Sequence, residues 1–264
     1  MSSAPPSLAS APLGALDCVR HAFYGREGGV SEGAFASLNC SPFAGDAPQA
    51  VRANRERVAR GLGAADLFTN HQVHGARVRV IGADADPREV VRADGLVTRE
   101  ARACLGVLAA DCAPVLFADA QARVIGAAHA GWRGALLGVT DAVIAAMTAL
   151  GARPARIVCA IGPAIQAASY RVGAPFRRRF FDGELPCEEF FGRDRGRDGD
   201  QDEGGYFFDL PGYLRRRIAR AGVAAPDVLP DDTFADSRRF FSYRRSCTQG
   251  EKDYGRQIGA IALV

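Results

Sequence analysis

The fold is decided by the stretch VIGAAHAGWRG, residues 124–134, together with the sequence that follows it. Residues 124–128 form a short apolar run that is typical of a buried strand, and His129 comes directly after it. Gly131 and Gly134 predict a turn, and the apolar residues beyond them recur at helical spacing up to Gly151, which predicts a helix that stops there. A buried strand that leads through a turn into a helix predicts a mixed α/β fold.

The remaining chain alternates between strands and helices in the same way. The segment at 48–63 has Val51, Val58 and Leu62 at helical spacing with charged residues between them, which predicts an amphipathic helix. A second helix is predicted around 211–221. Strands are predicted at 77–81, 104–109, 114–118, 156–161 and 258–264. The runs at 104–109 and 114–118 flank Asp111 and Cys112, so we expect two buried strands that meet at a turn.

Two segments lack the pattern of a packed core. Residues 1–16 are rich in Ser, Ala and Pro, and we expect a flexible N-terminal tail there, followed by one domain over residues 17–264. Residues 192–205 (GRDRGRDGDQDEGG) contain many charges and glycines but no apolar residue. This composition predicts a solvated, charged loop inside the domain.

Composition narrows the class of protein. The chain has 264 residues, 48% of them hydrophobic, and a net charge of +3 in which acids and bases are mixed, so a one-signed face for nucleic acid is not expected. Seven cysteines without paired spacing favour free thiols in a reducing compartment. No apolar run reaches the roughly 20 residues of a membrane span. We therefore expect a cytoplasmic protein, whose oligomeric state stays open.

Three residues of metal-ligand type lie in short, unusual segments: His74 in HQVHG (71–75), Cys112 in ADCAP (110–114) and His129 in HAGWRG (129–134). Cysteine thiolate and imidazole are ligands that zinc prefers, and three protein ligands leave a fourth position for water or substrate. Two alternatives stay open from the residues alone. His71 competes with His74 for the same role, and Cys112 with His129 can form a nucleophile and its base without any metal.

Several ordered motifs carry a resemblance to a known family. They are HQVHG (71–75), ADCAPVLFAD (110–119), AAHAGWRG (127–134), IGPAIQAASYRV (161–172), FFSYRR (240–245) and GRQIG (255–259). Together they resemble the YfiH/YlmD-type family, also called the laccase-domain or multicopper polyphenol oxidoreductase family, from about Arg26 to Gln257. The resemblance implies a layered α/β/β/α sandwich and a zinc ion held by His74, Cys112 and His129, and so selects His74 over His71.

The resemblance also implies an activity. The family is associated with phosphorolysis of the purine nucleosides adenosine, inosine and methylthioadenosine and with adenosine deamination, and its members are also described as peptidoglycan editing factors. Zinc-bound water would serve deamination, whereas phosphorolysis needs a bound phosphate, for which arginines are suited. We expect Cys112, His129 and Arg133 to be catalytic. Arg133 suits a phosphate because it lies where a turn opens a helix, a position that favours anions. The expected substrate-binding residues are Arg26, His71, Arg244 and Arg245.

Other function classes are weighed against this one. A multicopper oxidase needs many imidazoles, and a chain with four histidines has too few. A hydrolase of cell-wall precursors would use the same metal, or Cys112 as nucleophile. A binding protein that is merely stabilised by its metal would turn over none of these substrates. The sequence departs from the family pattern in the charged segment at 192–205 and in Tyr254, where a threonine is commoner.

Overall fold

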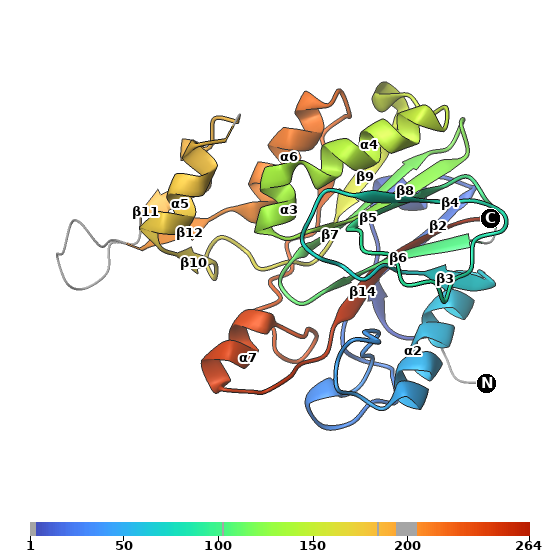
Figure 1. The fold of residues 1–264 in the computed structure, drawn as a ribbon, viewed down its shortest axis with the longest axis horizontal. Helices are drawn as coiled ribbons and strands as arrows, with labels where there is room; N and C mark the ends of the chain where they lie inside the picture. Colours follow the sequence, from blue (N-terminus) through green and yellow to red (C-terminus); the bar gives the residue numbers. More distant parts are fainter. Residues whose placement is uncertain (1–3, 102, 184, 194–204) are drawn as a thin grey trace.

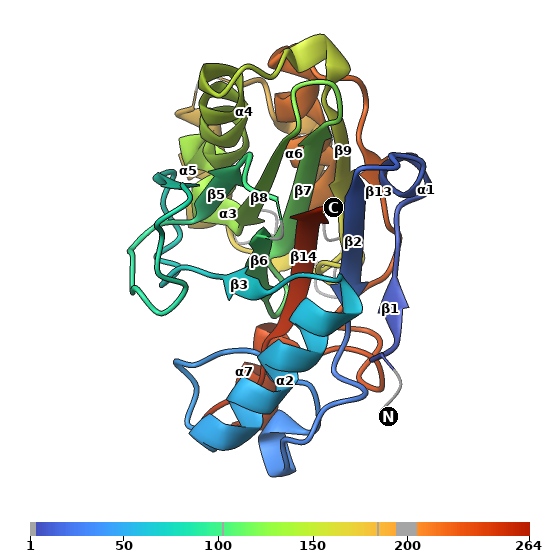
Figure 2. The same cartoon turned by 90° about the vertical axis from the view of Figure 1, so that its right-hand side faces the viewer.

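Two β-sheets face each other at the centre of the protein, as seen in a computed structural model that describes residues 4–101, 103–183, 185–193 and 205–264 (Figures 1 and 2). The five-stranded sheet has the order β1 (Ser7–Leu8), β2 (Val19–Tyr24), β14 (Gln257–Leu263), β6 (Ala103–Ala109) and β3 (Asp66–Phe68). The six-stranded sheet has the order β13 (Asp227–Val228), β9 (Val158–Ile161), β7 (Ala113–Asp119), β8 (Val124–Ala130), β5 (Gly95–Thr98) and β4 (Val78–Ile81).

Helices cover the outer face of each sheet. Figure 2 shows α2 (Pro48–Gly61) below the five-stranded sheet, and α4 (Val139–Ala149) and α6 (Leu210–Arg220) above the six-stranded one. The short helix α3 (Trp132–Leu137) leads into α4, while α1 (Ala11–Gly14) and α7 (Tyr243–Gln249) lie at the periphery (Figure 2). A small third sheet, β10 (Arg171–Val172), β12 (Tyr206–Phe208) and β11 (Phe191–Arg193), packs with α5 (Ala174–Phe181) at one end. The structure therefore confirms the mixed α/β fold and its layered α/β/β/α arrangement.

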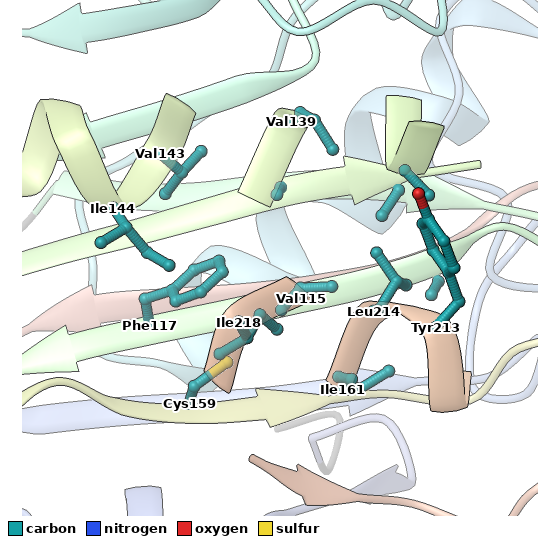
Figure 3. Packing of buried hydrophobic residues seen from close by; sticks show 14 of the residues in the cluster. Val115, Phe117, Val139, Val143, Ile144, Cys159, Ile161, Tyr213, Leu214 and Ile218 are labelled. Atoms are coloured by element: carbon teal, nitrogen blue, oxygen red, sulfur yellow. The ribbon is translucent and has the colours of Figure 1, made fainter. Parts of the chain in front are cut away.

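Apolar residues alternate across the central strands, which explains how both faces of each sheet are buried. On β6, Leu105 packs between the sheets, whereas Leu108 packs on the side of α2. On β7, Leu116 faces the space between the sheets, and Val115 and Phe117 face α4 and α6 (Figure 3). Strands buried on both faces read as continuous apolar runs, as the sequence does at 104–109 and 114–118.

The predicted elements agree with the structure in kind but not always in extent. The helix expected beyond Gly134 is two helices, because Gly138 adopts φ +82°, a left-handed conformation that ends α3. Arg217 of α6 packs against this glycine, with its Nη2 only 2.6 Å from where a Cβ would be. The strand expected at 156–161 begins at Val158, because residues 154–156 form a 3₁₀ turn.

The two segments expected to lie outside the packed core, residues 1–16 and 192–205, are described only in part by the structure. The structure describes residues 4–16 of the expected tail as packed: β1 pairs with β2, and Leu13 is fully buried between the sheets. A flexible tail is therefore wrong for these residues, because their few apolar side chains complete the core. Of the charged segment expected at 192–205, Gly192 and Arg193 end β11, and residues 194–204 lie outside the described part of the chain. No helix within that part is long and apolar enough to cross a membrane.

Candidate metal site

His74, Cys112 and His129 come together from three separate segments. His74 lies in the loop between β3 and β4, Cys112 lies where the chain crosses from β6 to β7, and His129 lies near the end of β8. Their ligand-type atoms are all within 4.8 Å of one another, and Cys112 Sγ is 3.9 Å from His74 Nε2. It is the one such group of histidines, cysteines and acids found among the described residues. The structure thus brings the predicted trio together.

A buried carboxylate that the sequence reasoning missed, Asp94, holds two of the three segments in place. It lies directly before β5 and is fully buried. Its Oδ1 accepts hydrogen bonds from His129 Nδ1 at 2.8 Å and from the His74 backbone N–H at 2.9 Å. Its Oδ2 accepts from the N–H groups of Val73 and Gly75. Because Nδ1 of His129 is engaged in this way, its Nε2 is left as the ligand atom.

The loop that carries His74 is also fixed to the five-stranded sheet. The Gln72 side-chain amide donates to the carbonyl of Leu108 and accepts from its N–H, both at 2.7 Å. His74 itself adopts φ +60°, a left-handed conformation that costs free energy in residues other than glycine. The hydrogen bonds from this loop to Asp94 hold it in that conformation. The imidazole of His74 is therefore positioned by its backbone rather than by packing around its ring.

The turn that presents Cys112 is anchored by its neighbour Asp111. The Asp111 carboxylate accepts hydrogen bonds from Thr233 Oγ1 at 2.8 Å, from Ser242 Oγ at 2.9 Å and from the Arg244 N–H at 2.7 Å. Burial nevertheless raises the pKa of this carboxyl. Asp111 has φ +88°, so the turn is tight as well as buried. The ADCAP segment is thereby tied to the beginning of α7, 131 residues further along the chain.

Cys112 and His129 form an electrostatic pair. Burial opposes a thiolate, but the charge of His129 and hydrogen bonds from both histidines outweigh it and lower the pKa of the Cys112 thiol to about 6. Burial likewise opposes a charged His129, but the Cys112 thiolate and the Asp94 carboxylate raise the pKa of His129 to about 9. A stabilised thiolate is the form of cysteine that binds metal or attacks a substrate. The site is therefore prepared for either chemistry.

Gly131 leaves the space that the trio needs. A Cβ at this position would lie 2.8 Å from Cys112 Sγ and 3.0 Å from His74 Cδ2. Its φ of −73° is ordinary, so the requirement is close approach and not backbone freedom. The glycine in the HAGWRG segment is thus explained by the two ligand-type side chains that it faces.

A cavity of about 530 Å³ opens above the trio. Its aromatic walls include Phe43, which stacks on His71 at 4.5 Å between ring centroids, and Tyr243, whose ring lies 5.4 Å from that of Tyr254. Polar groups from Asn70, Gln72, Ser41, Arg133 and Arg256 complete the lining. His71 therefore lies in the wall of this cavity, and His74, not His71, belongs to the close group.

A second cavity, of about 410 Å³, lies on another side of the same group. It shares His74, Cys112 and Trp132 with the first cavity. Its own lining is mostly apolar and aromatic, with Tyr170 and Phe176 among its residues. The ligand-type atoms thus lie between two cavities.

The structure separates the four arginines expected to bind substrate or phosphate. Arg133 lines the first cavity, where it is exposed and packs 5.0 Å from the Trp132 ring centroid. Arg244 lines the second cavity and donates to the Arg171 carbonyl.

Arg26 and Arg245 line a different cavity, which contains none of the trio. Arg26 donates to the carbonyls of Ala36 and Ser237, and Arg245 to those of Thr233, Phe234 and Phe240. These two guanidiniums hold loops together, and the structure does not bring them to the metal site.

The functional residues that the sequence reasoning missed had only weak signals. Asp94 is an acid directly before the apolar run GLVT (95–98), and Gln72 lies inside HQVHG. Arg256 lies inside GRQIG, a motif quoted for the resemblance, but it was not singled out. Asp94 and Arg256 share one signal, a charged residue directly before a buried strand, whereas Gln72 lies in the loop between β3 and β4.

Comparison with known proteins finds similar sequences over most of the chain. A family model described as "Multi-copper polyphenol oxidoreductase laccase" matches residues 20–264. A purine nucleoside phosphorylase of Streptomyces griseus is 40% identical over 235 residues, which cover 87% of this chain and 90% of that protein. A purine nucleoside phosphorylase of Deinococcus radiodurans is 39% identical over 250 residues, with 93% and 89% covered.

Solved structures are similar over nearly the whole chain. The YfiH protein of Bacillus licheniformis matches with a TM-score of 0.85 at 28% identity and covers 98% of this chain and 99% of its own. YlmD of Geobacillus stearothermophilus matches with a TM-score of 0.82 at 29% identity, with 96% and 94% covered.

Proposed function

Because the chain belongs to the multi-copper polyphenol oxidoreductase laccase family, whose curated relatives are named purine nucleoside phosphorylases, we propose that it is a purine nucleoside phosphorylase. Its substrates are adenosine, inosine and methylthioadenosine, with phosphate as the second substrate, and it also deaminates adenosine. The observation that carries the proposal is the group of His74, Cys112 and His129 at the base of a cavity of about 530 Å³.

We propose that zinc is held by His74, Cys112 and His129. The fit rests on the donor set: one stabilised thiolate and two imidazoles, one of which has its second nitrogen bound to a buried carboxylate. This is the ligand pattern of zinc sites that keep an open position. When bound, zinc supplies an activated water for deamination of adenosine. The copper chemistry in the family's description would need more histidines, and His21 is engaged elsewhere with the Ser10 N–H.

The chain's own residues bind and orient the substrates. Aromatic rings in the walls, such as Phe43 and Trp132, offer faces on which a purine can stack. His71 lies against Phe43 and contacts the nucleoside from the wall, and Arg244 contacts it from the second cavity. Arg133 is exposed at the first cavity and helps to attract phosphate. Arg26 and Arg245 are left out of the proposed site because they line a different cavity, which contains none of the trio.

Product analysis tests the proposed activity. The purified protein is incubated with inosine and with adenosine, each with and without phosphate, and bases and nucleosides are separated by chromatography. We expect hypoxanthine and ribose 1-phosphate from inosine only when phosphate is present, and inosine from adenosine in both conditions. Base release at the same rate without phosphate would contradict phosphorolysis. Absence of inosine among the products of adenosine without phosphate, where inosine is not consumed, would contradict deamination.

A variant of Arg133 separates the two activities. Only phosphorolysis needs a bound anion, so Arg133→Gln is expected to reduce phosphorolysis of inosine more than deamination of adenosine. Equal loss of phosphorolysis and deamination would contradict the proposed role of Arg133 in attracting phosphate.

One observation favours a second candidate, a hydrolase that uses Cys112 as its nucleophile. The lowered pKa of the Cys112 thiol and the adjacent His129 match a thiolate and its base. Cell-wall precursors are the substrate class for this candidate. A hydrolase of this kind would keep its activity after the metal is removed with a chelator, whereas the proposed zinc enzyme would lose deamination.

A further inference from the structure

Arg256 lies directly before β14 and lines the cavity that contains the trio. Its Nη1 donates to Ser41 Oγ at 3.2 Å, and its Nη2 donates to Tyr254 Oη at 3.1 Å. Its guanidinium also packs over the Tyr254 ring, 4.5 Å from the centroid. The backbone of Arg256 is fixed as well, because its N–H donates to Asn39 Oδ1 at 3.0 Å. Main chain and side chain are therefore both held.

The positive charge of Arg256 has no opposite charge beside it. No carboxylate in the described part of the chain lies within ion-pair distance of its guanidinium, and both of its hydrogen-bond acceptors are neutral hydroxyls. In contrast, Arg156 pairs with Asp119, and Arg217 pairs with Asp141. An arginine has five N–H donors, so three donors of Arg256 remain without a partner among the described residues. A half-buried cation of this kind favours an anion in the cavity.

Arg256 is better prepared for an anion than Arg133, the other arginine of this cavity. Arg133 is exposed, and no hydrogen bond of its side chain is present among the described residues. Ordering such a side chain costs conformational entropy on binding, whereas Arg256 is already oriented by two hydroxyls. The planar guanidinium of an arginine can also donate to two oxygens of one phosphate, which the ammonium group of a lysine cannot do in the same geometry.

We propose that Arg256 binds the phosphate co-substrate, with Tyr254 and Ser41 as the residues that position its guanidinium. The inference rests on the proposed phosphorolysis. In that reaction a phosphate oxygen forms a bond to the anomeric carbon of the ribose, and the glycosidic C–N bond breaks. The bonding electron pair leaves with the base, which takes up a proton released by phosphate or solvent. Arg256 holds the attacking phosphate and takes no part in the proton transfer.

Steady-state kinetics with Arg256→Gln provide the first test. The KM for phosphate is expected to rise at least about tenfold, a change of about 1.4 kcal/mol, while the KM for inosine changes less than twofold. Arg20→Gln is the matched control, because it removes the same charge from β2. Arg20 pairs with Ala262, so it lies about 17 Å along β14 from Gln257 at 3.3 Å per residue. Equal rises in both KM values, or no rise, would overturn the proposal.

Calorimetric titration with inorganic phosphate gives a readout that does not depend on turnover. The parent protein and Arg20→Gln are expected to bind phosphate, and Arg256→Gln to bind it at least about tenfold more weakly. Unchanged binding in Arg256→Gln would overturn the inference even if kinetics were altered. If the parent released no base from inosine, the proposed function would fail, and this titration would still decide the role of Arg256.

Two further variants cover the case in which the glutamine variant does not fold. Arg256→Lys keeps the charge but loses the fork, and we expect a KM for phosphate between those of the parent and Arg256→Gln. Tyr254→Phe keeps the ring and removes only the hydroxyl that orients Nη2. It is expected to raise the KM for phosphate without changing kcat, as a positioning residue would. A lysine variant and a phenylalanine variant that both match the parent would overturn the proposal.

Discussion

Replacing Asp94 by asparagine changes the carboxylate that accepts four hydrogen bonds at the candidate metal site, with little change in shape. Its Oδ1 serves the His74 N–H and His129 Nδ1, and its Oδ2 serves the N–H groups of Val73 and Gly75. An asparagine amide presents donors in one of these two places, whichever way it is turned. Two of the four donors therefore lose their acceptor.

The expected effect on stability is large because Asp94 is fully buried. A buried donor without an acceptor costs about 1–3 kcal/mol. Because the N–H groups of the loop are only partly buried, the loss of two acceptors should lower the free energy of unfolding by about 1–3 kcal/mol rather than by twice that cost. The same change loosens the His74 loop or the His129 ring. Loss of such a supporting partner typically weakens metal affinity by about 10–100-fold. We expect both effects in Asp94→Asn.

Urea unfolding of the metal-free protein measures the first effect, and competition with a chromophoric chelator measures the affinity for zinc. Asp86→Asn is the control, because Asp86 is an exposed carboxylate that pairs with the exposed Arg88 and lies outside the candidate site. It should leave both quantities unchanged within error. If Asp94→Asn unfolded within about 0.5 kcal/mol of the parent, the range of ordinary surface changes, and bound zinc equally well, the assigned role of Asp94 would be wrong.

Three further predictions concern residues around the same site. The parent is expected to hold roughly one zinc per chain, and His74→Ala, Cys112→Ala and His129→Ala are each expected to lose it, since two protein ligands are too few; elemental analysis that finds undiminished zinc would refute the ligand set. His71→Ala should retain most of its zinc and lose part of its activity, because His71 stacks on Phe43 in the cavity wall; metal loss as complete as in the ligand variants would show that it was misassigned. Gly131→Ala should lower zinc content, because its Cβ would lie 2.8 Å from Cys112 Sγ, and a variant with parental zinc content would mean that the site relaxes around the methyl group.

The elements were predictable where the local pattern decides the structure. Strands β6 and β7 are buried on both faces, so their apolar runs could be recognised directly. The division of the long helix was not predicted, although its cause, Gly138 in a left-handed conformation, is a local signal. The contact that Arg217 makes with this glycine could not be predicted, because the two residues are distant in the sequence. The packing of residues 4–16 was missed for a similar reason: a few apolar residues suffice once β2 offers a free edge.

The residues of the candidate site were likewise predictable only in part. Cysteine and histidine in unusual segments pointed to the site by chemical type, but they left His71 and His74 as alternatives, and only the family resemblance selected His74. The residues that orient the trio or complete its cavity act on partners far away in sequence: Arg256 bonds to Ser41, 215 residues earlier. Arg26 and Arg245 were expected at the substrate from their motifs, and the structure shows both donating to backbone carbonyls. An isolated sequence does not reveal which acceptor an arginine will find.

Trp132 is the only tryptophan of the chain, and it lines both cavities that meet at Cys112. Intrinsic tryptophan fluorescence therefore originates from a single indole at the site. Its emission responds to changes in polarity and to ring stacking in either cavity, without contributions from tryptophans elsewhere. The protein thus carries its own spectroscopic probe, and a simple titration of emission intensity can follow the occupancy of the site in solution without a label or an engineered reporter.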